Sequence, residues 1–192
     1  MTQSAQLVHG ARSTRHAFPD TKVAIVEDNR LIRESLEDLI HTAPECRCVC
    51  LCSTAEEALK VLPRHQPDIV LMDIQLPNIS GIECTARLKQ LFPSTQIIMV
   101  TVYEDTDRIF KALRAGACGY LLKCCTPEEL VAAVREVRQG GAPMSREIAR
   151  KVIHPSRNRS PRRRKLKAFP PAKPTSSNCS RRAVPTNRSP PA

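Results

Sequence analysis

Residues 69–83 read Ile-Val-Leu-Met-Asp-Ile-Gln-Leu-Pro-Asn-Ile-Ser-Gly-Ile-Glu. Four apolar residues in a row, with no polar alternation, are typical of a strand covered on both faces, as in a parallel sheet. The run ends in an acidic residue, Asp73. This stretch therefore predicts a buried strand that carries a carboxylate at its carboxyl end.

Four further short runs alternate with amphipathic segments, and they cover residues 23–26, 46–51, 97–100 and 119–122. Between them lie apolar stripes at helical spacing, such as Ile32, Leu36, Leu39 and Ile40. Five strands alternating with five helices over about 120 residues predict a doubly wound α/β domain. Right-handed crossovers then place the carboxyl ends of all strands at one edge of the sheet, where ligands bind.

Three helix ends have sequence signals. Ser53 followed by Glu56 predicts a capping box at the start of the second helix, and Thr126-Pro127 predicts the start of the fifth. Gly140-Gly141 predicts the end of that fifth helix.

The positive charge is concentrated at the end of the chain. The formal charge is +11, yet residues 1–153 hold 19 Lys and Arg against 19 Asp and Glu. Residues 154–192 hold the other 11 Lys and Arg, no acidic residue, and 8 of the 16 prolines. We therefore expect a disordered arm over 1–20, a globular domain over 21–141, a short helical linker over 142–153 and a basic, disordered tail over 154–192. No apolar run approaches 18 residues and the first twenty residues lack an apolar core, so we expect a cytoplasmic protein without a membrane span.

Four of the nine cysteines, Cys46, Cys48, Cys50 and Cys52, recur at two-residue spacing in the expected second strand. That spacing places all four on one face of a strand, roughly 7 Å apart from one to the next. Four ligands of one zinc ion cannot lie along a strand in this way. We interpret them as small apolar side chains in a reducing compartment.

Polar residues follow four of the five predicted strands. Glu27-Asp28 follows the first, Asp73 the third, Thr101 ends the fourth, and Lys123 follows the fifth. Taken singly, each has an ordinary structural explanation: an acid as a helix cap, a threonine in a strand, a solvated lysine. Together they place three mutually repelling carboxylates at one edge, an arrangement that suits Mg²⁺, with a lysine and a hydroxyl facing a phosphoryl group.

The chain resembles the receiver domain of two-component response regulators between about residues 22 and 140. The resemblance rests on Val-Ala-Ile-Val-Glu-Asp-Asn (23–29), the stretch 69–83, Ile-Ile-Met-Val-Thr (97–101) and Gly-Ala-Cys-Gly-Tyr-Leu-Leu-Lys (116–123). The later Thr-Pro-Glu-Glu-Leu and Gly-Gly-Ala-Pro-Met-Ser are most similar to the subfamily with a LuxR-type helix-turn-helix.

This resemblance implies a flavodoxin-like sheet of strand order 2-1-3-4-5 and a set of roles for the converging residues. Asp73 would accept a phosphoryl group from a sensor histidine kinase. The Mg²⁺ ligands would be Glu27, Asp28, Asp73 and the backbone carbonyl of Gln75. Lys123 would pair with the phosphate, and Thr101 and Tyr120 would form a switch that reshapes the face of the fourth helix, fifth strand and fifth helix. Val102 and Tyr103 depart from the commonest pattern of this family. The resemblance implies that Val102 affects access of the phosphodonor and that Tyr103 affects the lifetime of the phosphate.

The LuxR-type subfamily continues with a DNA-binding domain of about sixty residues, whereas the basic tail has no apolar periodicity with which to build one. A frameshift is the alternative. Ser160-Pro161-Arg162 resembles the opening of that domain, and shifted codons of the following basic residues can encode the acidic residues expected there.

Three functions compete at this point. The first is a phosphorylation-controlled receiver acting through protein contacts, including those of a homodimer. The second is a DNA-binding regulator whose output domain is truncated or frameshifted, with nonspecific DNA contact through the tail. The third is a phosphatase with an Asp nucleophile, but such enzymes carry a second Asp two positions later, where this chain has Gln75. We therefore expect no enzymatic activity beyond the chain's own phosphotransfer and dephosphorylation.

Overall fold

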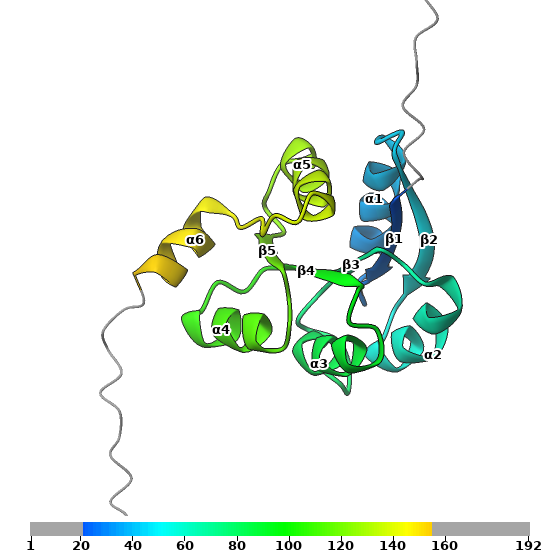
Figure 1. Cartoon of the computed structure of the whole chain (residues 1–192), viewed down its shortest axis with the longest axis horizontal. Coiled ribbons are helices and arrows are strands. Elements are labelled where there is room, and N and C mark those ends of the chain that lie inside the picture. Colours follow the sequence, from blue (N-terminus) through cyan, green and yellow to red (C-terminus); the bar gives the residue numbers. More distant parts are fainter. Residues whose placement is uncertain (1–20, 155–192) are drawn as a thin grey trace, which may run out of the picture. The chain divides into compact units, whose positions relative to one another are not determined.

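A computed structural model of the chain describes residues 21–154, so the predictions made for 1–20 and 155–192 lie outside the described residues. All five predicted strands are present and pair in parallel in the order β2-β1-β3-β4-β5, which confirms the predicted fold class (Figure 1). Their bounds are β1 Thr21–Val26, β2 Cys46–Cys52, β3 Ile69–Met72, β4 Gln96–Thr101 and β5 Gly119–Leu122.

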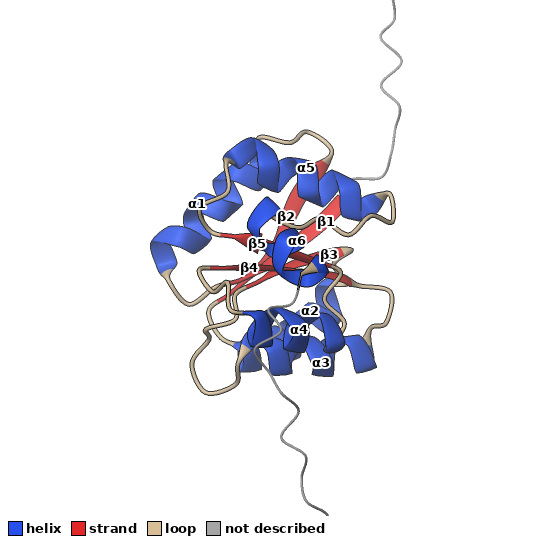
Figure 2. Cartoon of the chain, turned by 90° about the vertical axis from the view of Figure 1, so that its left-hand side faces the viewer, coloured by secondary structure: helices blue, strands red, loops and turns tan. Residues whose placement is uncertain are grey.

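Helices cover both faces of this sheet, as Figure 2 shows. The first layer holds α1 (Arg30–His41) and α5 (Pro127–Arg138), and the second holds α2 (Ala55–His65), α3 (Gly81–Leu91) and α4 (Thr106–Arg114). The strand side chains alternate between two apolar cores. Val23 and Ile25 of β1 pack beneath the first layer, whereas Ala24 and Val26 pack beneath the second. Burial of both faces explains why the strand sequences are continuously apolar.

The ends of α5 follow the sequence signals, whereas the start of α2 differs from the prediction. Thr126 and Glu129 form the complete capping box at the start of α5, and Gly140, with a φ of +85°, follows the end of that helix. The capping box predicted from Ser53 and Glu56 is not formed. Thr54 is the cap and accepts from the Glu57 N–H, while the Glu57 carboxylate accepts from the backbone N–H of Ser53, the residue before the cap.

The four alternating cysteines do not share one face, contrary to our prediction. The pairing of β2 with β1 shifts by one residue between Cys48 and Cys50, because Val49 is an extra residue that forms a β-bulge. Cys46 and Cys48 therefore pack with the α1/α5 core, whereas Cys50 and Cys52 pack with the α2/α3/α4 core.

The segment after α5 returns to the outer edge of β5. The Tyr120 N–H donates to the Pro143 carbonyl at 2.9 Å, and the Ser145 N–H donates to the Tyr120 carbonyl at 3.1 Å. The helix α6 (Arg146–Ile153) follows and contacts α4, with Ile148 fully buried. Residues 143–153 thus belong to the same packed body as the sheet. No helix among the described residues is long and apolar enough to cross a membrane.

Candidate functional site

Three carboxylates meet at the carboxyl edge of the sheet, as the sequence predicted. Glu27 and Asp28 follow β1, and Asp73 follows the neighbouring β3. One oxygen from each lies within 4.8 Å of the others. Glu27 and Asp73 are buried, whereas Asp28 is exposed at the entrance. Exposure of one member leaves the cluster open to a ligand from solvent.

Lys123 supplies the positive charge of the site from the loop after β5. Its Nζ atom lies 2.7 Å from Glu27 Oε2 and 2.9 Å from Asp73 Oδ2. Burial lowers the pKa of Lys123, but its bonds to the two carboxylates outweigh this effect and raise the pKa overall. Burial also raises the pKa of Glu27, and the lysine offsets this rise only in part. The cluster thus holds three carboxylates and one ammonium.

The main chain around Asp73 is tightly held. Asp73 Oδ1 accepts a hydrogen bond of 2.7 Å from the Ile74 N–H, and the Asp73 N–H donates to the Val26 carbonyl at 2.9 Å. Gly81, the first residue of α3, packs against the Asp73 carbonyl so closely that a Cβ atom at Gly81 would lie 1.7 Å from that oxygen. A side chain is thus excluded at Gly81 by the backbone of Asp73.

The two predicted switch residues are both buried beside the site. Thr101 ends β4 with no exposed surface, and Tyr120 of β5 is equally buried. The Tyr120 hydroxyl donates to the Tyr103 carbonyl at 2.6 Å, and burial raises the pKa of this hydroxyl. Tyr120 is therefore tied to the loop that begins at Thr101.

The loop between β4 and α4, which includes Tyr103, also contacts the residues that follow Asp73. The Tyr103 hydroxyl donates to the side-chain oxygen of Gln75, and the Arg108 guanidinium lies 3.7 Å from the centre of the Tyr103 ring. These contacts describe the Gln75 side chain, whereas the predicted role of its backbone carbonyl as a metal ligand stays a prediction.

One contact of the acidic loop was missed by the sequence reasoning. Arg33, in the first turn of α1, donates from Nη1 to the Glu27 carbonyl at 2.6 Å and to the Asp28 carbonyl at 3.2 Å. One sequence feature could have indicated it. Helix N-termini favour negative charge, yet the first turn of α1 holds arginine and no acidic residue, so a partner for the arginine was to be expected nearby.

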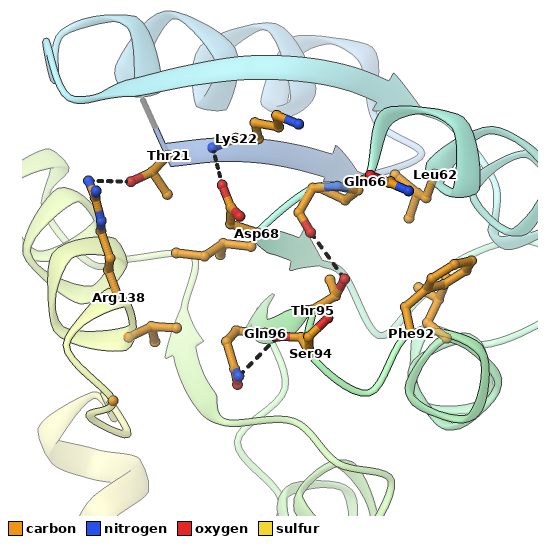
Figure 3. A pocket seen from close by; sticks show the side chains of 15 residues that line it. Thr21, Lys22, Leu62, Gln66, Asp68, Phe92, Ser94, Thr95, Gln96 and Arg138 are labelled. Carbon is orange, nitrogen blue, oxygen red and sulfur yellow. Dashed lines mark hydrogen bonds between the residues drawn. The ribbon is translucent and has the colours of Figure 1, made fainter. Parts of the chain in front are cut away.

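A separate cavity of about 860 Å³ opens at the opposite, amino edge of the sheet (Figure 3). Its wall includes Lys22, whose backbone N–H donates to the Asp68 carboxylate, and Arg138, which donates to the Thr21 hydroxyl. These polar groups are engaged with each other. The three converging carboxylates make the carboxyl edge the candidate functional site.

Comparison with known proteins identifies the family of the chain. Residues 23–135 match the family model described as the response regulator receiver domain. The chain belongs to this family. It thus contains the receiver domain of a response regulator of a two-component system, and its resemblance to the family is confirmed.

The relatives of this receiver domain are LuxR/NarL-family response regulators, and the two described here are named transcriptional regulatory proteins. The chain is 36% identical over 137 residues to the uncharacterized transcriptional regulatory protein YhcZ of Bacillus subtilis, covering 71% of this chain and 64% of the relative. It is 31% identical over 132 residues to the transcriptional regulatory protein DegU of Brevibacillus brevis, covering 69% and 56%. The receiver-containing chain therefore spans less than two thirds of these relatives' length.

Solved structures give the same result for the receiver domain. A LuxR-family response regulator from Aurantimonas sp. SI85-9A1 superposes with a TM-score of 0.68 at 32% identity, covering 71% of this chain and 97% of that one. The signal receiver domain of the putative regulator NarL from Mycobacterium tuberculosis superposes with a TM-score of 0.61 at 26% identity, covering 63% and 98%.

The donor set of the receiver site fits a hard divalent cation. Carboxylate oxygens are the ligands that Mg²⁺ prefers, and the exposed Asp28 leaves room for the waters that this ion retains. A cation beside Glu27 would favour its charged form and so oppose the effect of burial on its pKa.

Proposed function

We propose that this receiver takes a phosphoryl group from a sensor histidine kinase onto Asp73, with Mg²⁺ bound by Glu27, Asp28, Asp73 and the Gln75 carbonyl. The observation that carries the proposal is the contact of Lys123 with both Glu27 and Asp73 in the cluster that includes Asp28. A carboxylate with a cation site and a fixed ammonium beside it is suited to accept a phosphoryl group.

The chemistry asks little of the protein beyond alignment. An oxygen of Asp73 forms a bond to phosphorus while the bond from phosphorus to the donor's imidazole nitrogen breaks, and the imidazole leaves as a neutral group after taking up a proton. Bound Mg²⁺ would neutralise charge on the phosphoryl oxygens. Lys123 is placed to exchange its contact with Asp73 Oδ2 for one with a phosphoryl oxygen.

Thr101 and Tyr120 would carry the signal away from the phosphate. We infer that the Thr101 hydroxyl moves to a phosphoryl oxygen and that Tyr120, bonded to the Tyr103 carbonyl, follows the loop. The face made by α4, β5 and α5 would change shape as a result. Exchange between two such packings is the usual form of a switch in a close-packed core.

The first experiment tests the phosphoacceptor. Incubation with acetyl phosphate and Mg²⁺ should add one phosphate that is labile to acid and base, measured by mass spectrometry of the intact chain. Asp73→Asn should abolish the labelling. Asp38→Asn changes an exposed acid of α1 and serves as the matched control, so it should label fully. Full labelling of Asp73→Asn would refute the assignment.

The second experiment tests the metal ligands. Removing one of three carboxylates lowers the negative charge of the site and therefore its affinity for a cation. Asp28→Ala should weaken Mg²⁺ binding in calorimetric titrations, while Asp38→Ala should not. Equal affinity of Asp28→Ala and the parent chain would contradict the proposed ligand set.

A second function is favoured by the printed names of the relatives, which are transcriptional regulatory proteins. We propose as the alternative that the protein regulates transcription through contact with DNA. The 11 basic residues of 154–192 would then give DNA affinity that falls with salt and ignores sequence. Titration of DNA with the full chain and with a chain ending at Ile153 tests this alternative. Loss of affinity with the tail supports contact through it, whereas selective DNA binding that persists without the tail would place DNA recognition in residues 1–153.

A further inference from the structure

The loop that carries two of the three carboxylates is short and held from two sides. Only residues 27–29 separate β1 from α1. On the sheet side, the Glu27 N–H donates to the Cys52 carbonyl of β2 at 3.0 Å. On the helix side, the Arg33 guanidinium donates to the backbone carbonyls of Glu27 and Asp28.

The geometry of this contact is that of a clamp on the main chain. The same nitrogen, Nη1, reaches the Glu27 carbonyl at 2.6 Å and the Asp28 carbonyl at 3.2 Å. A carbonyl that is bonded to a guanidinium fixes the orientation of the peptide group, and this orientation sets the direction of the side chains that flank it. The clamp thus acts on the two residues that the loop contributes to the site.

The position of Arg33 near the N-terminus of α1 is electrostatically unfavourable by itself, and the bonds to the two carbonyls compensate for it. A cation in the first turn of a helix opposes the helix dipole. Arg30, in the same turn, is exposed and pairs with Glu34 four residues later. Arg33 is instead half-buried and turns back to the loop, where the two carbonyls replace the solvation that it loses.

We propose that Arg33 is a positioning residue for the metal site of this receiver, and that it acts by holding the Glu27–Asp28 main chain so that both carboxylates face Asp73. The inference rests on the proposed function, since it concerns the same Mg²⁺ site. Three carboxylates in one cluster repel each other, and a loop without its clamp relieves the repulsion by moving Asp28 outward. The clamp keeps that loop in the geometry that binds the cation.

The test is a calorimetric Mg²⁺ titration of the full chain and of three single variants. Loss of a group that orients metal ligands typically weakens metal affinity about 10- to 100-fold, so Arg33→Ala should weaken Mg²⁺ binding by this amount. Arg33→Lys should restore part of the affinity, because an ammonium can still donate to a carbonyl. Arg30→Ala, the matched control on the same helical turn, should bind like the parent.

A second measurement distinguishes positioning from a general structural role. In the background of Asp28→Asn, the loop carries one fewer carboxylate for the clamp to orient, so adding Arg33→Ala should cost much less affinity than it does in the parent chain. Far-UV circular dichroism of every variant, with and without Mg²⁺, checks that the comparison is made on folded protein. Folded Arg33→Ala that binds Mg²⁺ as tightly as the parent would overturn the inference.

The outcomes also separate this inference from the proposed function. A parent chain that binds no Mg²⁺ would overturn both. A parent that binds Mg²⁺ and takes up phosphate, together with an Arg33→Ala variant of equal affinity, would overturn the positioning role alone. Equal losses from Arg33→Ala in the parent and in Asp28→Asn would likewise show that Arg33 does not act through Asp28.

Discussion

At Gly81 the backbone of Asp73 occupies the space that a side chain would need. A Cβ atom there would lie 1.7 Å from the Asp73 carbonyl oxygen and 3.1 Å from Cγ of Met72. Both obstacles belong to β3 and the residue that follows it, which the sheet fixes. The backbone must therefore move if any other residue replaces Gly81.

We expect Gly81→Ala to lower the free energy of unfolding by about 3 kcal/mol or more, as overpacking against fixed backbone does. It should also weaken Mg²⁺ binding, because the displaced atoms belong to Asp73. Urea denaturation and calorimetry give the two quantities. Gly140→Ala is the control: its Cβ meets nothing within 4 Å, so only the φ of +85° opposes it, at about 1 kcal/mol. Similar losses from both variants would contradict this account.

Tyr103 gives a second prediction at the scale of the residue. Its ring lies under Arg108 and its hydroxyl bonds the Gln75 side chain, two residues beyond Asp73. If Asp73 is phosphorylated as proposed, removal of this cover admits water, and Tyr103→Ala should shorten the lifetime of the phosphate. Decay of label after removal of acetyl phosphate measures it. Arg114→Ala, at the end of α4 and outside these contacts, should decay like the parent. A lifetime unchanged in Tyr103→Ala would refute the prediction.

The residues that converge at the site could be predicted because they occupy strand ends. In a parallel sheet the carboxyl ends meet at one edge, so Asp73, Thr101 and Lys123 follow from the positions of apolar runs alone. Arg33 could not be found in this way. Its contact joins a side chain to carbonyls five and six residues earlier, and that distance depends on the shape of the loop.

At the scale of the element, α6 depends on one buried residue. Ile148 is fully buried between α6 and the core, whereas Ile153 of the same helix is 70% exposed. Lys151 adds a contact with the Glu104 carboxylate at 2.8 Å. The helix has eight residues and is too short to persist without packing.

Ile148→Ala should therefore release α6 from the body at a cost of about 2 kcal/mol or more. Hydrogen exchange of the Tyr120 and Leu122 amides, which donate to Pro143 and to Ser145 Oγ, should accelerate. Ile153→Ala, the same change at an exposed position, should leave both rates near those of the parent. Slow exchange in Ile148→Ala would show that residues 143–145 hold to β5 without the helix.

The bulge in β2 shows what strand-level prediction misses. The spacing of the four cysteines predicts one face, since side chains alternate strictly in a regular strand. Val49 interrupts that alternation, yet nothing in the Cys-Arg-Cys-Val-Cys-Leu-Cys sequence marks it as the extra residue. The bulge arises from pairing with β1, where Val23 and Ala24 meet Cys48 and Cys50.

At the scale of the whole molecule, the thiols that are packed into the core respond to alkaline pH in the same direction. Burial raises the pKa of the Cys48 thiol from 9.0 to about 11 and that of Cys84 to about 12. The unfolded chain releases these protons near pH 9, while the folded chain retains them. Stability from these thiols is therefore complete below pH 9 and is lost as the pH rises toward 11 and 12.

Urea midpoints should accordingly decrease between pH 8.5 and pH 10.5 under reducing conditions. Cys84→Ala should weaken that dependence, whereas Cys124→Ala, a change at an exposed thiol, should leave the slope as in the parent. A midpoint that is constant over this interval would mean that the folded chain releases the protons as easily as the unfolded one.

The two edge strands of the sheet, β2 and β5, differ in what prevents a strand of another molecule from pairing with them. At β5, residues 143–145 already occupy part of the border through their bonds to Tyr120. At β2 the border is guarded by an exposed Arg47 and by the bulge at Val49, both of which hinder regular pairing. The apolar Val-Cys-Leu-Cys stretch behind this charge has the composition of an aggregation-prone segment. We therefore expect Arg47 to oppose edge-to-edge association, so that aggregation of concentrated protein depends on a charge far from the carboxylate cluster.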